Sequence, residues 1–256
     1  MIYKRVAARL HAQDWVAITI ELGIVVLGVF IGTQVSNWNA ARIERRETRA
    51  MLVGLKPGLK GFVDFFVTAR DYYGTTSRYG NVALAGWSGD KKVRDSDFVI
   101  AAYQASQVYV LGINAVNWTR VFGGERMDGI DDPAMRNELA NLMTLNFDQI
   151  DMVSIDTPYR QHVRQQIPDD IQDAIRAKCG DRPIPDKPLT QALPRTCAID
   201  LPGDRWAQAA RTLRAHPELA GELRWHRAAT AAFLNNMSLF EQQTRLVLGR
   251  IHELGL

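Results

Sequence analysis

The sequence predicts an all-α protein in which one N-terminal transmembrane helix continues into a helical bundle with a long C-terminal helix. An apolar stretch near the N-terminus is long enough to cross a bilayer, and apolar residues recur every three or four positions near the C-terminus. No stretch alternates apolar and polar residues strongly enough to predict a sheet. We expect a short basic N-terminal segment over 1–14, the transmembrane helix over 15–38 and an extramembrane helical domain over 39–256.

The composition fits one folded body with an appendage. The chain has 256 residues, of which 46% are hydrophobic, which is enough for one good-sized domain and too apolar for a disordered protein. The formal charge is +3, and the basic excess lies within residues 1–60, beside the apolar stretch, where anionic lipid would attract it. A nucleic-acid-binding protein would carry that charge on its folded body. We therefore expect the lipid bilayer, and no nucleic acid, as a partner.

The apolar stretch has the length and the ends of a membrane span. Trp15 and Trp38 enclose about 34 Å of helix at roughly 1.5 Å per residue, which matches a bilayer core with aromatic residues at both surfaces. The run is longer than the apolar part of a signal peptide, and the polar residues after it do not resemble a cleavage site. A buried core helix is the other alternative. The residues expected at the membrane surfaces are Trp15, Gln34, Asn37, Trp38 and Asn39.

Glu21, Gly28 and Gly32 fall on one face of this expected helix. Two glycines four residues apart let two helices approach closely, and a carboxylate in lipid normally faces a helix bundle, water or a partner. Their shared face predicts association with a second copy of the chain or with another membrane protein. In the alternative, Glu21 lies about 9 Å inside the Trp15 boundary and its side chain reaches the headgroups.

The stretch ELGIVVLGVFIGTQVSNWN resembles the N-terminal signature of an uncharacterised bacterial family of single-pass membrane proteins, a domain of unknown function. In that family a Glu opens an apolar helix that ends in Gln, a β-branched residue and Asn-Trp-Asn. Gly32 stands where the family more often has Ala. The resemblance implies a membrane-anchored helical protein without a known activity. The matching positions are Glu21, Gly28, Gln34, Val35, Asn37, Trp38 and Asn39.

Two signals for the membrane orientation conflict. More basic residues follow the span than precede it, which favours a cytoplasmic C-terminal body by the positive-inside rule. Cys179 and Cys197, the only two cysteines, bracket a Pro-rich loop and predict a disulfide, which forms in an oxidising compartment. Because long domains translocate with little regard to charge, we expect a bacterial inner-membrane protein with its C-terminal domain in the periplasm. The alternative is two reduced, buried cysteines in a cytoplasmic domain.

Two long helical stripes are expected to face the core of the body. Pro57 and Gly58 interrupt the first stripe and predict a kink there. The first stripe consists of Leu52, Leu55, Leu59, Phe62, Phe66, Ala69 and Tyr73, and the second of Leu219, Leu223, His226, Thr230, Phe233, Met237, Phe240, Thr244, Val247, Ile251 and Leu254.

Shorter helices are expected between these two. The helix over 131–153 would begin with Asp131 or Asp132 as its N-cap and Pro133 in its first turn. The others cover 95–111, 168–178 and 203–214.

The sequence contains no motif that predicts an enzyme. It has no phosphate-binding loop, nucleophile elbow or recognisable Cys-His pairing. Glu222 and His226, one helical turn apart, could form half of a metal site, but His226 lies on the apolar stripe, where a hydrogen-bonded core histidine is the simpler interpretation. We therefore expect no catalytic residue, no cofactor and no metal.

The polar and aromatic segment NWTRVFGGERMDGIDD is the remaining candidate for a ligand or partner site. The alternative is a turn whose glycines set the backbone geometry. The residues that a ligand or partner would contact are Trp118, Arg120, Glu125 and Arg126.

These observations favour a membrane-anchored helical scaffold or interaction protein that self-associates, or binds a partner, through its transmembrane helix. One alternative is a subunit of an oligomeric ion channel or proton-coupled assembly, in which several copies of Glu21 line a path. The other is a periplasmic ligand sensor that acts through a separate membrane protein, because the residues before the span are too few for an output domain.

Overall fold

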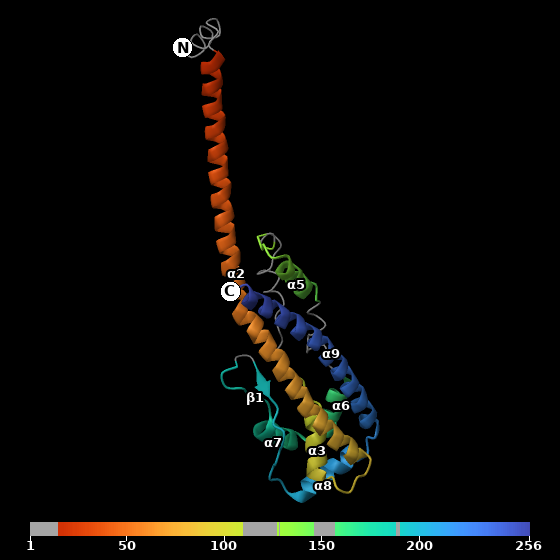
Figure 1. The fold of residues 1–256 in the computed structure, drawn as a ribbon. Coiled ribbons are helices and arrows are strands. Elements are labelled where there is room, and N and C mark those ends of the chain that lie inside the picture. Colours follow the sequence, from red (N-terminus) through yellow and green to blue (C-terminus); the bar gives the residue numbers. More distant parts are fainter. Residues whose placement is uncertain (1–14, 110–126, 128, 146–156, 188–189) are drawn as a thin grey trace. The chain divides into compact units, whose positions relative to one another are not determined.

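The computed structural model describes residues 15–109, 127, 129–145, 157–187 and 190–256 (Figure 1). Its regular structure is helical apart from one small hairpin, so the predicted all-α class is confirmed. The helices are α2 (Trp15–Trp87), α3 (Asp95–Gln104), α5 (Pro133–Thr144), α6 (Pro158–Gln166), α7 (Asp169–Cys179), α8 (Gly203–Arg214) and α9 (Glu218–Glu253). Strands β1 (Arg182–Pro183) and β2 (Gln191–Ala192) pair antiparallel, a hairpin that the sequence did not predict. The chain divides into two compact units, residues 1–52 and 53–256.

The first unit contains the apolar part of α2. The most apolar window of this helix is wholly exposed, and by length and composition it could cross a membrane. Its large side chains, such as Leu22, Leu27 and Phe30, would face water along the length of the window, which is unfavourable for a helix in aqueous solution. This exposure does not fit the alternative of a buried core helix.

In the second unit, α2 continues through Pro57 without interruption to Trp87. The predicted stripe is buried at Leu55, Leu59, Phe66, Ala69 and Tyr73, and half-buried at Phe62. The buried face is wider than that stripe, since Phe65 and Tyr72 beside it are buried as well.

α9 follows the predicted pattern closely. All the expected positions from Leu219 to Ile251 are buried, whereas Leu254 lies beyond the helix end and is partly exposed. Within this unit α9 packs along α2, where Phe240 contacts Phe66 and Phe233 contacts Tyr73 (Figure 1). The aromatic side chains of these two helices form the centre of one hydrophobic cluster.

A second cluster joins α3, α6 and α8 to the end of α2. Phe98 of α3 packs edge-on against Trp87, with the ring centroids 5.0 Å apart. Gly86 makes this approach possible, because a Cβ atom there would lie 2.1 Å from the Phe98 ring. The indole of Trp87 also donates a hydrogen bond to the carbonyl of Leu213 in α8, at 2.8 Å.

The shorter helices begin where the sequence predicts but two end earlier. Asp132 is the N-cap of α5, its side chain accepting a hydrogen bond from the Ala134 amide at 3.2 Å, and Pro133 opens the helix as expected. α5 ends at Thr144, because Leu145 is already extended, and α3 ends at Gln104. α7 and α8 match the expected ranges, whereas α6 was not predicted.

Candidate functional site

The structure places Glu21, Gly28 and Gly32 on α2, all of them exposed. A Cβ atom added at either glycine would meet no other atom within 4 Å, so the backbone is open to a neighbouring helix at both positions. Seven and four residues separate the three positions, which brings them to one face of a helix with 3.6 residues per turn. The role of this face in association stays a prediction.

Trp15 and Trp38 are both exposed on α2, as are Gln34, Asn37 and Asn39. The Arg42 guanidinium lies over the Trp38 ring, 5.8 Å from its centroid. An aromatic ring and a basic side chain next to each other are typical of the end of a membrane span, where both reach the headgroup layer. Their interfacial position is still a prediction.

Cys179, the last residue of α7, forms a disulfide with Cys197, with the two Cα atoms 5.6 Å apart. The disulfide closes the segment that contains the β1–β2 hairpin. Hydrogen bonds tie this segment to α2: Tyr72 donates to the Asp181 carboxylate at 2.8 Å, and Tyr79 donates to the Pro194 carbonyl at 2.9 Å. The disulfide therefore closes a segment that hydrogen bonds hold against α2 at more than one point.

The four residues of the predicted partner or ligand loop, Trp118, Arg120, Glu125 and Arg126, lie outside the described residues. The prediction for this loop therefore stands untested by the fold.

His226 and Glu222 point to different partners. His226 is buried, and its Nδ1 lies 2.5 Å from Oγ1 of Thr157. Burial, together with the positive charge of Arg160, lowers the pKa of His226 to about 4, which keeps the ring neutral at ordinary pH. Glu222 instead contacts His162, with Oε1 2.8 Å from Nδ1. This arrangement matches a hydrogen-bonded core histidine, and the described residues contain no cluster of three or more potential metal-binding side chains.

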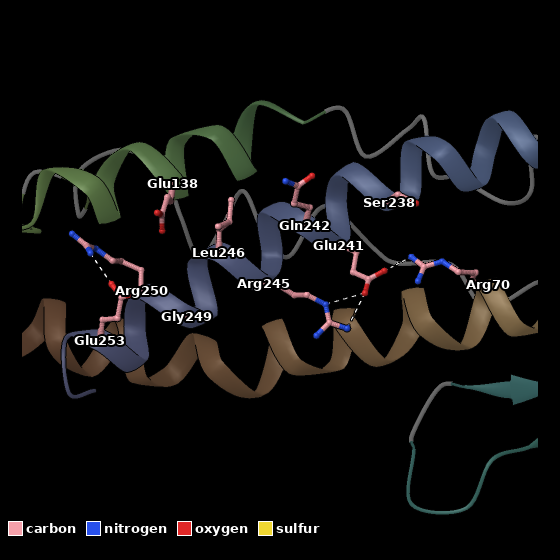
Figure 2. A pocket seen from close by; sticks show the side chains of 10 residues that line it. All are labelled: Arg70, Glu138, Ser238, Glu241, Gln242, Arg245, Leu246, Gly249, Arg250 and Glu253. Carbon is pink, nitrogen blue, oxygen red and sulfur yellow. Dashed lines mark hydrogen bonds and ion pairs between the residues drawn. The ribbon is translucent and has the colours of Figure 1, made fainter.

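One site was not predicted from the sequence: a cavity of about 510 Å³ lined by α2, α5 and α9 (Figure 2). α2 contributes Arg70 and α5 contributes Glu138. The α9 residues are Ser238, Glu241, Gln242, Arg245, Leu246, Gly249, Arg250 and Glu253.

One side of this cavity is positively charged. Arg70 and Arg245 both pair with Glu241, and the Arg245 Nε lies 2.9 Å from Glu241 Oε1. Burial raises the pKa of Glu241, but the hydrogen bonds from the two guanidinium groups outweigh it and leave this pKa below its usual value. Because Arg70 and Arg245 share the single ionised carboxylate of Glu241, the three side chains together carry a net charge of +1.

The other side of the cavity is negatively charged (Figure 2). Arg250 pairs with both Asp132 and Glu253, with its nearest nitrogens 2.7 Å from each carboxylate. Glu138, which lines the cavity on the same side, takes part in none of the ion pairs that the described residues form. Its Oε2 atom is buried and has no hydrogen-bond partner among the described residues.

The cavity depends on contacts between distant parts of the sequence, so no local sequence pattern predicts it. Arg70 and Glu241 are 171 residues apart, and Asp132 and Arg250 are 118 apart. The one local signal is on α9, where Ser238, Gln242, Arg245, Gly249 and Glu253 follow one another every three or four residues beside the apolar stripe. This spacing indicates a polar face on α9, but it does not show that Arg70 of α2 and Glu138 of α5 lie against that face.

The sequence matches no family model, and comparisons with curated proteins and with solved structures gave no significant match. Functional interpretation therefore depends on the side chains of this chain and their contacts.

Proposed function

We propose that this protein is a membrane-anchored helical scaffold. The segment 15–38 of α2 spans a bacterial inner membrane and associates there with a second copy or another membrane protein, while the helical body lies in the periplasm. The observation that carries the proposal is the wholly exposed apolar window of α2, in which Gly28 and Gly32 leave the backbone open on the face that also bears Glu21.

Lipid explains the exposed apolar side chains, and a second helix explains the face with the glycines. In a bilayer, helices gain no hydrophobic energy by leaving lipid, so close van der Waals packing at small residues drives their association. Glu21 favours the same face, since a carboxylate within the span is less costly beside another helix than in lipid.

The disulfide supports the periplasmic side. Structural disulfides persist in oxidising compartments and are rare in the cytosol. Cys179 and Cys197 are joined at the end of α7, and Cys179 is almost fully buried there.

Native mass spectrometry of the full chain, extracted from its own membranes in mild detergent, tests the proposal. Gly28→Ile places a branched side chain on the proposed contact face. Gly23→Ile is a matched control, because Gly23 is equally open and lies on the opposite side of the helix, about 200° from Glu21 at 100° per residue. We expect the wild type and Gly23→Ile to form a discrete oligomer or complex that Gly28→Ile disrupts. Monomers in all three samples would contradict the proposal, as would the same complex in all three.

The channel alternative has one observation in its favour: Glu21 shares the proposed contact face, so an oligomer would bring several carboxylates together. Glu21→Gln should then abolish ion flux in reconstituted vesicles while preserving the oligomer. Absence of flux in the wild-type oligomer would leave the scaffold as the function.

A further inference from the structure

Oε2 of Glu138, a buried oxygen with no hydrogen-bond partner in the part of the chain that the structure describes, is the most informative feature of the cavity between α2, α5 and α9. Burying such an atom unpaired costs free energy, so native proteins rarely retain one without a reason. A ligand that donates hydrogen bonds would satisfy Oε2, and a positively charged donor would also balance the negative charge on this side.

An ammonium group fits this side of the cavity better than a metal ion does. Calcium and magnesium require several oxygen ligands at once. The other carboxylate that lines this side, Glu253, already accepts a hydrogen bond from the Arg250 guanidinium, which is also bound to Asp132. An ammonium group needs only one carboxylate and carries three donors.

The opposite side of the cavity offers a place for an anionic group. The side chains of Arg70 and Arg245 are 49% and 54% exposed, although both pair with Glu241. Each guanidinium has five N–H donors, so donors remain for a carboxylate or similar anion. Figure 2 shows these two arginines with Glu241 on one side of the cavity and Glu138 with Arg250 and Glu253 on the other.

We infer that this cavity binds a small zwitterionic amine, whose ammonium group pairs with Glu138 and whose anionic group faces Arg70 and Arg245. Arg245 and Arg250, on the two sides of the cavity, are five residues apart, which is about 7.5 Å along the axis of α9 at roughly 1.5 Å per residue. A ligand that reaches both sides is therefore of about this length. Leu246 and Gly249 lie between the two sides and accommodate a short aliphatic chain.

Gly249 keeps this middle part of the cavity open. A Cβ atom there would meet no atom within 4 Å, so a larger residue would project into free space without disturbing its neighbours. Gly249→Leu should therefore fill the site and leave the fold intact.

Isothermal titration of the full chain in detergent micelles, with empty micelles as the blank, tests the inference with three probes of similar length. 5-Aminopentanoate carries both charges, pentylamine only the ammonium group, and pentanoate only the carboxylate. We expect 5-aminopentanoate to bind roughly tenfold more tightly than pentylamine, because hydrogen bonds to charged groups contribute most to affinity. Pentanoate should bind most weakly.

Three substitutions in the cavity assign the contacts, and one outside it serves as control. Glu138→Gln should weaken 5-aminopentanoate and pentylamine alike, by roughly tenfold or more, and leave pentanoate unaffected. Arg245→Gln should remove the preference for 5-aminopentanoate over pentylamine. Gly249→Leu should weaken all three probes. Asp173→Asn, on the exposed side of α7, should change none of these affinities.

Two results would overturn the inference. One is the absence of binding of both amine probes to the wild type at millimolar concentration. The other is unchanged affinity for the amine probes in both Glu138→Gln and Gly249→Leu, with circular dichroism showing that both variants are folded. Neither result concerns association through α2. The test of this binding site is therefore independent of the test of the proposed scaffold function.

Discussion

Arg250 of α9 holds the N-cap of α5 through two hydrogen bonds: its Nε lies 2.7 Å from Oδ2 of Asp132 and its Nη2 lies 3.1 Å from Oδ1. The same Asp132 carboxylate accepts a hydrogen bond from the Ala134 amide. One side chain therefore both starts α5 and fastens it to α9. Since Glu138 lies on α5, this pairing also positions the carboxylate that lines the cavity.

Two substitutions at Asp132 should separate these roles. Asp132→Asn can still cap α5 but loses the charged pair with Arg250, whereas Asp132→Ala loses both. We expect Asp132→Ala to lower the melting temperature by roughly 2–4 °C and Asp132→Asn to lower it less. Hydrogen exchange should show faster opening of α5 in both variants.

Asp131→Ala is the control for this prediction, because Asp131 is exposed and precedes the cap. Equal melting temperatures for the Asp131 and Asp132 alanine variants would show that the cap and the ion pair contribute nothing measurable.

The lowered pKa of His226 predicts that the free energy of unfolding decreases on mild acidification. Its pKa is about 4 in the folded chain because of burial and the nearby Arg160 charge, and about 6.5 when unfolded. Between these values the unfolded chain binds a proton that the folded chain does not, so the free energy of unfolding decreases as the pH falls from 6.5 toward 4. The loss should be on the order of 2–3 kcal/mol over that range.

Urea unfolding of the wild type and of His226→Gln at several pH values checks this expectation. The variant should show a flatter pH dependence between 6.5 and 4, whatever its absolute stability. His252→Gln, at an exposed position on α9, should keep the wild-type slope. The same slope in all three chains would mean that His226 does not titrate as proposed.

Glu138→Met should stabilise the protein and abolish binding of 5-aminopentanoate. The substitution removes a buried oxygen that has no hydrogen-bond partner among the described residues, at nearly constant side-chain volume. We expect the melting temperature to rise by roughly 2–4 °C, as is common when a ligand-binding group is replaced by an apolar one. Glu253→Met, which removes a partner of Arg250, should give no such gain. A drop in stability of the Glu138 variant would indicate that its carboxylate is structurally satisfied.

The sequence predicted the structure best where the feature depends on a single helix, such as which of its faces is buried or where it begins. The α9 stripe recurs every three or four residues, and tertiary packing buries it as the period requires. The Asp132 cap and Pro133 were predictable as well, because capping depends on residues within one turn.

Features that depend on packing between distant segments were not predictable. Phe65 and Tyr72 are buried beside the α2 stripe because Tyr109 packs against both rings, a contact between residues more than thirty positions apart. Helix α6 is only nine residues long, with Tyr159 and Val163 its buried residues, too few to form a clear period. The cavity was not predictable for a related reason: its charges come from three helices, and no local pattern shows that Oε2 of Glu138 finds no hydrogen-bond partner among the described residues.

The disulfide between Cys179 and Cys197 leads to a prediction about the stability of the protein and about the cellular compartment of its body. Cys179 and Cys197 are 18 residues apart, and closing a loop of that length stabilises the folded chain by roughly 3 kcal/mol in the chain-entropy account. In urea unfolding, the double variant with Cys179→Ser and Cys197→Ser should have a free energy of unfolding lower than that of the wild type by roughly 3 kcal/mol. In cells, free thiols are trapped with a mass-tagged maleimide after acid quenching, with and without prior reduction. If the body lies in the periplasm, as we propose, the wild type should be labelled only after reduction, because that compartment keeps disulfides oxidised. Labelling without reduction would mean that the cysteines are reduced in the cell, and would place the body in the cytoplasm, as the basic residues after the span would favour.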